Sequence, residues 1–191
     1  MTHLLAYLVQ FLEEGTPWLL CILPLYGLWR LAVWYDPVVP LWKHTAADRL
    51  REARLVLLTG YLVLLFTQTF EDYGTESELR LVPLQMIVTQ TMEAVKSPTG
   101  VRAFLFNIVG NMAVFVPIGW LTAALCDGNF RQTVLTGFGL SLFIETVQLP
   151  LNRTSDVDDL LLNTLGAAIG CGVWRMIERL RQRDVKHKRR Q

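Results

Sequence analysis

The sequence has few residues of the kinds that form metal centres, disulfide frameworks or histidine-dependent active sites. It contains three cysteines and three histidines in 191 residues. Cys21, Cys126 and Cys171 lie far apart, each in or beside an apolar run, without metal-ligand spacing or a paired extracellular pattern. We therefore expect small buried cysteines. The histidines lie away from the polar residues described below, so we do not expect histidine catalysis.

Positive charge is absent from the first 29 residues and concentrated near the end of the chain. No small-residue cleavage site follows the first apolar stretch, so we expect no removed signal peptide. Eight of the 18 Lys and Arg residues lie between Arg175 and Arg190, directly after an apolar run. A basic segment in this position is more typical of a cytoplasmic anchor beside anionic lipid than of a nucleic-acid site. We predict a basic cytoplasmic tail over 175–191 and no nucleic-acid partner.

Hydrophobic residues make up 52% of the sequence and are gathered into long runs. A run of about 17 to 23 residues can cross the roughly 30 Å hydrocarbon core of a bilayer. Such runs predict spans at about 17–35, 54–70, 103–125, 133–151 and 157–177. Residues 1–14 and 84–95 are too short to cross, and we expect a short interfacial helix at 1–14 and an interfacial or re-entrant helix at 84–95. The fold class predicted is an all-α polytopic membrane helix bundle of about five transmembrane helices, with a single membrane-embedded domain over 1–174.

The distribution of Lys and Arg predicts how this bundle is oriented. With the C-terminus inside, the inner segments carry thirteen Lys and Arg residues and the outer segments carry four. This asymmetry follows the positive-inside rule. We therefore expect a multi-pass protein of the inner (cytoplasmic) membrane, with its N-terminus outside and the loop over 71–102 on the outer side.

Polar residues occur inside and beside the apolar runs, where lipid makes each of them unfavourable. Glu145 lies roughly 8 to 9 Å from the outer end of its predicted helix, and Asn163 lies roughly 9 Å into the next one. Asn107 and Asn111 are four residues apart, so they are predicted to share one helical face. We expect these groups to converge in a polar pocket open to the outer surface. The candidate binding residues are Asn107, Asn111, Glu145, Gln148, Arg153, Asp156, Asp159 and Asn163.

Glu145 admits two interpretations. Together with Gln148 and Ser141 it forms a polar stripe along one side of its helix, at a depth where a carboxylate must be paired, hydrogen-bonded or protonated. One possibility is a structural ion pair with Arg153 or Arg102 that joins two helix ends. The other is a functional role in the pocket, and the sequence leaves both open.

The acidic residues after Ser155 also admit two interpretations. Ser155 and Asp158 have the spacing of a capping box, and Asp156 and Asp159 lie where the positive end of a helix dipole favours acids. The alternative is a Mg²⁺ or Ca²⁺ site that faces a phosphate. We favour helix capping, and predict neither a metal nor a cofactor.

Two glycines in the last apolar run indicate close helix packing. Gly166 and Gly170 are four residues apart in the segment GAAIG. This small-xxx-small spacing lets two helix backbones approach closely.

Three segments in a fixed order resemble the VanZ-like family of bacterial membrane proteins. They are NIVGN (107–111) followed by FVPIG, then SLFIETVQL (141–149), then RTSDVDDLLLN (153–163) followed by TLGAAIG. The resemblance covers about 80–172. It departs from the family pattern at RLVPL, where Arg80 and Leu84 stand in place of an asparagine and a phenylalanine. It implies a multi-pass membrane protein, and one named family member is associated with low-level resistance to the lipoglycopeptide teicoplanin.

These observations support two hypotheses from different functional classes. The first is a non-catalytic membrane protein whose outward-facing pocket binds a cell-envelope lipid, a lipid-linked precursor or a lipoglycopeptide, with a link to envelope integrity or antibiotic tolerance. Arg153 is the side chain best suited to a phosphate or carboxylate in such a pocket. The second is a membrane enzyme that acts on lipid phosphates through a metal-assisted carboxylate site. The sequence identifies no catalytic residue for it.

Overall fold

The computed structural model describes residues 2–34, 45–69, 79–149 and 155–188. These residues are helical apart from turns and one pair of two-residue strands, which confirms the predicted all-α class. The chain forms two compact units, Met1–Glu71 and Asp72–Gln191. The single domain predicted over 1–174 stays a prediction.

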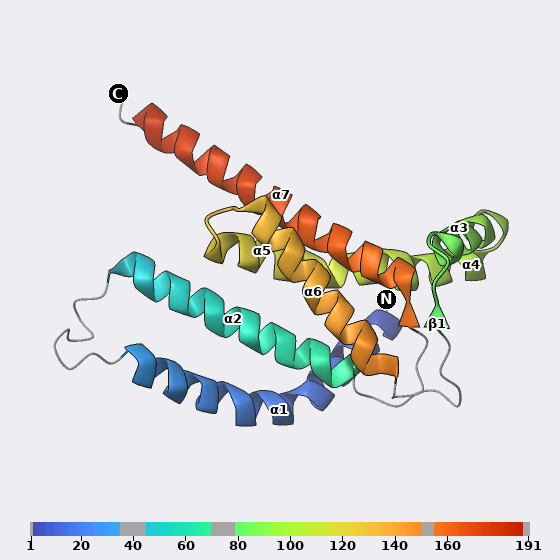
Figure 1. Cartoon of the computed structure of the whole chain (residues 1–191), viewed down its shortest axis with the longest axis horizontal. Helices are drawn as coiled ribbons and strands as arrows, with labels where there is room; N and C mark the ends of the chain where they lie inside the picture. Colours follow the sequence, from blue (N-terminus) through green and yellow to red (C-terminus); the bar gives the residue numbers. More distant parts are fainter. Residues whose placement is uncertain (1, 35–44, 70–78, 150–154, 189–191) are drawn as a thin grey trace. The chain divides into compact units, whose positions relative to one another are not determined.

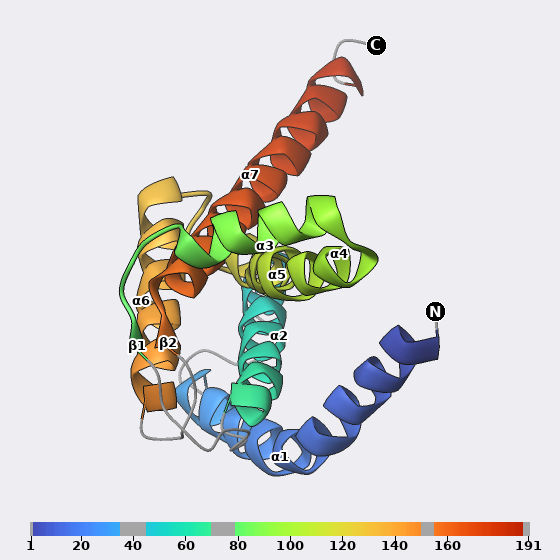
Figure 2. The ribbon, with the colours of Figure 1, turned by 90° about the vertical axis from the view of Figure 1, so that its right-hand side faces the viewer.

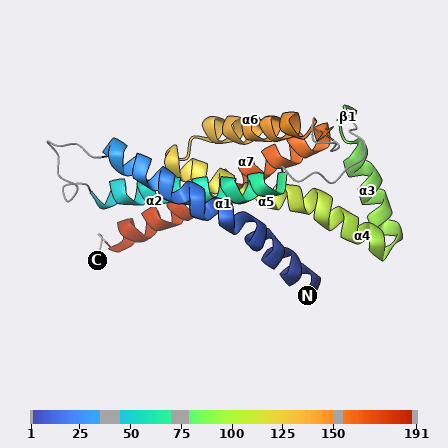
Figure 3. The same cartoon turned by 90° about the horizontal axis from the view of Figure 1, so that it is seen from below.

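The first unit consists of two long helices, α1 (Thr2–Trp34) and α2 (Ala46–Thr69), that pack against each other (Figure 3). The expectation of a separate short helix over 1–14 was wrong, because α1 continues through both Pro17 and Pro24. Each proline removes one backbone hydrogen bond and crowds the preceding turn. The helix nevertheless spans both positions.

Helix α2 begins with a capping box, several residues before residue 54, where the membrane span was predicted to start. The Thr45 hydroxyl accepts a hydrogen bond from the Asp48 amide at 3.2 Å, and the Asp48 carboxylate accepts one from the Thr45 amide at 2.8 Å. Further along, the Arg30 Nε donates to the Glu52 carboxylate at 2.9 Å and links α1 to α2. The charged residues over 48–54 are therefore part of the helix.

The second unit is built around three helices that run side by side, α5 (Gly110–Leu125), α6 (Phe130–Gln148) and α7 (Val157–Lys188) (Figure 1). Helix α5 continues from α4 (Pro98–Phe104) through a π-helical turn, η2 (Leu105–Val109). Helix α7 extends through most of the segment predicted as a basic tail.

Two helical runs among the described residues are long and apolar enough to cross a membrane. They are Pro98–Leu125 and Val157–Asp184, each of 28 residues. They include the predicted spans at 103–125 and 157–177. The predicted total of about five transmembrane helices stays a prediction.

Small residues bring α5 and α7 into backbone contact. A Cβ atom added at Gly166 would lie 2.2 Å from the Met112 carbonyl oxygen, and one at Gly170 would lie 2.1 Å from the Val116 carbonyl oxygen. Gly119 of α5 meets the backbone of Ala167 of α7 in the same way. No side chain fits between the helices at these positions.

Helices α3 (Gln85–Lys96) and α4 run close together, joined by a turn at Ser97 (Figure 2). The Ser97 side chain accepts a hydrogen bond from the Gly100 amide at 3.0 Å and caps α4. Helix α3 covers the segment for which a short interfacial or re-entrant helix was predicted. Strands β1 (Leu79–Arg80) and β2 (Ser155–Asp156) pair in parallel beside the start of α3, with Arg80 opposite Asp156.

The cysteines correct one expectation. Cys171 is fully buried, but Cys126 is half-buried and Cys21 is exposed. Within each unit, neighbouring helices cover only part of the circumference of a helix. An apolar position in a run therefore does not always become a buried one.

Candidate functional site

Asp158 joins the start of α7 to the start of α3. Its side chain is fully buried and accepts hydrogen bonds from the backbone amides of Met86 at 2.8 Å, Ile87 at 3.2 Å and Leu84. These amides belong to the first turn of α3, whose N–H groups have no partner within the helix. Asp158 was predicted to form a capping box with Ser155. It instead caps a helix more than 70 residues away in the sequence.

Leu84 adopts an unusual backbone conformation at this contact. Its φ of 66° lies in the left-handed region, which is unfavourable for a residue with a branched side chain by about 1 to 3 kcal/mol. Leu84 precedes α3 directly, and its amide donates to Asp158. The long-range cap thus stabilises a strained turn at the position where the sequence departs from the VanZ-like pattern.

Glu145 is buried on α6 and accepts hydrogen bonds from the strand that precedes α7. The Ser155 hydroxyl donates to its carboxylate at 2.8 Å, and the Asp156 amide donates to the same oxygen at 3.1 Å. The Asp156 carboxylate in turn accepts the Asp158 amide at 2.9 Å, so Asp156 caps α7. Capping was therefore predicted correctly for Asp156. The Ser155 hydroxyl, which was predicted to take part in a capping box, instead donates to Glu145.

Two further hydrogen bonds tie α7 to its neighbours. The Asn111 amide of α5 donates to the Asp159 carboxylate, and the Asn163 amide donates to the Ser141 hydroxyl of α6 at 2.9 Å. Ser141 and Asn163 are both buried. We call these hydrogen-bonded groups on α7, β2 and the neighbouring helices the polar network. Its members are Asn111, Ser141, Glu145, Ser155, Asp156, Asp158, Asp159 and Asn163.

Two of the predicted binding residues, Asn107 and Gln148, make no hydrogen bond to this network among the described residues, and a third lies outside them. Asn107 is exposed in η2, whereas Asn111 is half-buried. The expectation that these two asparagines share a helical face stays a prediction. Gln148 is half-buried at the last residue of α6. Arg153 lies outside the described residues, so its ion pair with Glu145 stays a prediction, and Arg102 is exposed on α4.

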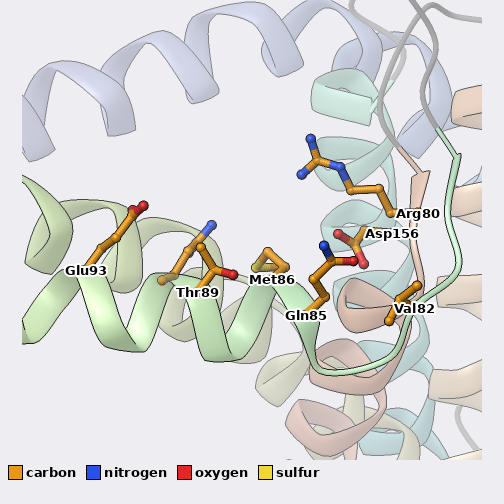
Figure 4. Close-up of a pocket in the computed structure, with 8 residues that line it drawn as sticks. Arg80, Val82, Gln85, Met86, Thr89, Glu93 and Asp156 are labelled. Carbon is orange, nitrogen blue, oxygen red and sulfur yellow. The ribbon is translucent and has the colours of Figure 1, made fainter.

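A pocket of about 410 Å³ lies next to the polar network, along one side of α3. Figure 4 shows Arg80 of β1 and Asp156 of β2 near one end and Glu93 further along α3. We call it the α3 pocket. Its polar lining residues are Arg80, Gln85, Thr89, Gln90, Glu93 and Asp156, and its apolar lining residues are Val82 and Met86.

Sequence reasoning missed most of this pocket. A signal was present, because Gln85, Thr89 and Glu93 recur every four residues and therefore lie on one face of α3. Apolar residues occupy the other face, and Val88, Met92 and Val95 are exposed there. Arg80 could not be placed from the sequence, because the strand pairing brings it opposite Asp156, 76 positions later.

The described residues do not provide a multidentate metal site. No group of three or more His, Cys, Asp or Glu side chains in the described part of the chain has the arrangement of a metal centre. The two Asp158 oxygens both accept backbone N–H groups of α3. The carboxylates that suggested a metal in the sequence thus serve as hydrogen-bond acceptors in the fold.

Comparison with known proteins agrees with the resemblance found in the sequence. The model of the VanZ/LLP1 family matches residues 53–178, which is more than half of the chain. No curated protein matches the chain, and neither does a solved structure. The family match includes α3, the polar network, the first candidate membrane helix and the second one up to residue 178. The chain therefore belongs to the VanZ/LLP1 family.

Proposed function

We propose that this chain is a multi-pass membrane protein whose α3 pocket binds the headgroup of a cell-envelope lipid or lipid-linked precursor. The observation that carries the proposal is the α3 pocket itself, where Arg80 lies among hydrogen-bonding side chains beside a buried polar network. A guanidinium is the side-chain group best matched to a phosphate. A lipoglycopeptide belongs to the same class of ligand, since it combines an ionisable head with an acyl chain.

Exposed apolar surface on the second unit supports a membrane location. Large apolar side chains on α7 recur three or four residues apart and remain exposed; they are Leu161, Leu165, Ile169, Val173 and Met176. A contiguous apolar stripe of this kind is unusual on a protein surrounded by water. Acyl chains would cover it, while the glycine face of α7 packs on α5.

The proposed topology has about five spans and places the α3 pocket at the outer leaflet of the cytoplasmic membrane. The excess of Lys and Arg in the inner segments supports this orientation. Helix α3 suits the interface, because it presents a polar face to the pocket and exposed apolar residues on its other side. A bound lipid would have its headgroup in the pocket and its chains among these apolar residues.

The test compares the lipids retained by purified wild-type protein and by Arg80→Gln, measured by mass spectrometry. We expect the wild type to retain phospholipid or a lipid-linked precursor, and Arg80→Gln to retain about tenfold less, because a hydrogen-bonded charge contact is lost. Arg102→Gln is the matched control, since Arg102 is an exposed arginine outside the pocket. Equal lipid retention by wild type and Arg80→Gln would contradict the proposal.

A cellular measurement tests the envelope role. Cells that express Arg80→Gln in place of the wild type should be more sensitive to glycopeptides or detergents, and cells that express Arg102→Gln should not. Unchanged sensitivity together with normal protein levels would argue against a role in envelope integrity. Arg153→Gln in the same assays tests the arginine that the sequence favoured.

A further inference from the structure

Among the residues that the structure describes, the lining of the α3 pocket contains more negative than positive charge. Arg80 is its only cation among the described residues, whereas Glu93 and Asp156 are both carboxylates. A purely anionic headgroup would gain the attraction of Arg80 but would be repelled by the two acids. A ligand that carries a cationic group as well as a phosphate avoids this repulsion.

Gln90 adds a second observation that points to a ligand. Its side-chain carbonyl oxygen is shielded from solvent and has no hydrogen-bond partner among the described residues. Leaving a buried acceptor unpaired is unfavourable, and native structures rarely do so without a reason. Gln90 also lines the α3 pocket, so a turn of its side-chain amide toward the pocket would let a bound donor satisfy this oxygen.

Glu93 lies one helical turn beyond Gln90. The two residues are three positions apart on α3, so their side chains lie on one side of the helix, and both line the pocket. Two acceptors, one of them charged, form a site for an ammonium group, which has three N–H donors and no acceptor. Arg80 comes from the other side of the pocket, on β1 (Figure 4).

We propose that the α3 pocket recognises a zwitterionic aminolipid headgroup, with its phosphate at Arg80 and its primary ammonium at Gln90 and Glu93. This inference rests on the proposed lipid binding and specifies its ligand class. Phosphatidylethanolamine is the simplest lipid with this chemistry. Phosphatidylglycerol has the phosphate without the ammonium, and phosphatidylcholine has a cationic nitrogen without N–H donors.

The experiment measures binding of these three lipids to the delipidated full-length protein by native mass spectrometry in detergent. We expect phosphatidylethanolamine to bind about tenfold more tightly than phosphatidylglycerol or phosphatidylcholine, because only its headgroup brings a cationic N–H donor to Gln90 and Glu93. Equal binding of all three lipids would overturn the headgroup inference. If the wild type bound all three lipids equally and Arg80→Gln bound each of them more weakly, the headgroup inference would fail but the proposed lipid binding would stand.

Variants on α3 separate recognition from folding. Glu93→Gln should weaken phosphatidylethanolamine binding about tenfold and leave phosphatidylglycerol binding unchanged or stronger, while the exposed-acid control Asp184→Asn changes neither. Gln90→Met should remove the stabilisation that phosphatidylethanolamine confers on thermal unfolding without lowering the melting temperature of the lipid-free protein. A fall in lipid-free stability with unchanged lipid selectivity would assign Gln90 a structural role and overturn its place in the site.

A competition arm distinguishes a lipid from a soluble ligand of the same chemistry. Soluble phosphoethanolamine should displace the lipid only at much higher concentration, because it lacks the acyl chains that contact the apolar side of α3. Displacement at equal concentration would show that the acyl chains make no contribution. That result would overturn the lipid as the source of the headgroup.

Discussion

Helix α7 makes two different kinds of contact along its length. At its N-terminal end, Asp158 and Asp159 bind groups on α3 and α5 through hydrogen bonds. In its middle, Gly166 and Gly170 lie against the backbone of α5, with no room for a side chain. The first contact fixes which atoms face each other, and the second fixes how closely two helices approach.

The two contacts should therefore respond differently to substitution. A hydrogen bond lost from the polar network leaves donors that water or other groups can partly satisfy. A Cβ atom placed about 2 Å from a backbone oxygen produces a steric clash that water cannot relieve, so the helices must move apart. Substitutions in the glycine face should therefore have the larger effect on stability, and substitutions in the polar network the smaller and more local effect.

The largest effect is expected from the double substitution Gly166→Ala with Gly170→Ala. Separating α5 from α7 should lower the free energy of unfolding by about 5 kcal/mol. The measurement is unfolding in mixed detergent micelles. The control is Gly139→Ala with Gly172→Ala, where an added Cβ meets nothing within 4 Å. A double variant as stable as this control would mean that α5 and α7 are not in backbone contact.

An intermediate effect is expected from Asp158→Ala. Three backbone amides at the start of α3 would lose their acceptor, which should lower the free energy of unfolding by about 3 kcal/mol. Hydrogen exchange should also become faster in the first turn of α3, at Met86 and Ile87. Asp184→Ala, at an exposed acid of the same helix, is the control. Unchanged exchange in α3 would contradict the long-range cap.

The smallest effect is expected from Asn163→Ala. The substitution removes one buried hydrogen bond to Ser141 and should destabilise the protein by about 1 kcal/mol. Asn107→Ala should have almost no effect on stability, because that asparagine is exposed. Measuring the free energy of unfolding of both variants in one assay distinguishes an amide of the polar network from an amide on the surface. Equal effects would mean that the Asn163 contact contributes nothing.

The polar residues around Asp158 show where sequence reasoning succeeds and where it ends. Their spacing predicted helix capping, and Asp156 does cap α7. The cap made by Asp158 could not be predicted, because its partners lie on a helix more than 70 residues earlier. Local patterns report on hydrogen bonds within one turn, whereas a contact between distant segments depends on how the helices pack.

Asn107 and Asn111 illustrate a different limit. Their spacing of four residues predicted one helical face and a shared pocket. In the structure Asn107 is exposed in the π-helical turn Leu105–Val109, while the Asn111 amide donates to Asp159. Spacing along a helix does not show which of its turns another helix covers, because that depends on how the helices pack.

The sequence by itself determined the all-α class, the family and the apolar runs that form the two candidate membrane helices, because composition and residue order fix hydrophobic periodicity. It also identified Glu145, Asp156, Asp159 and Asn163 as polar groups that need compensation. The partners of Glu145, Asp159 and Asn163 depend on how distant segments pack, and the same packing places Arg80 opposite Asp156 at the α3 pocket. Burial of a polar group demands a partner, but the geometry of packing selects which one.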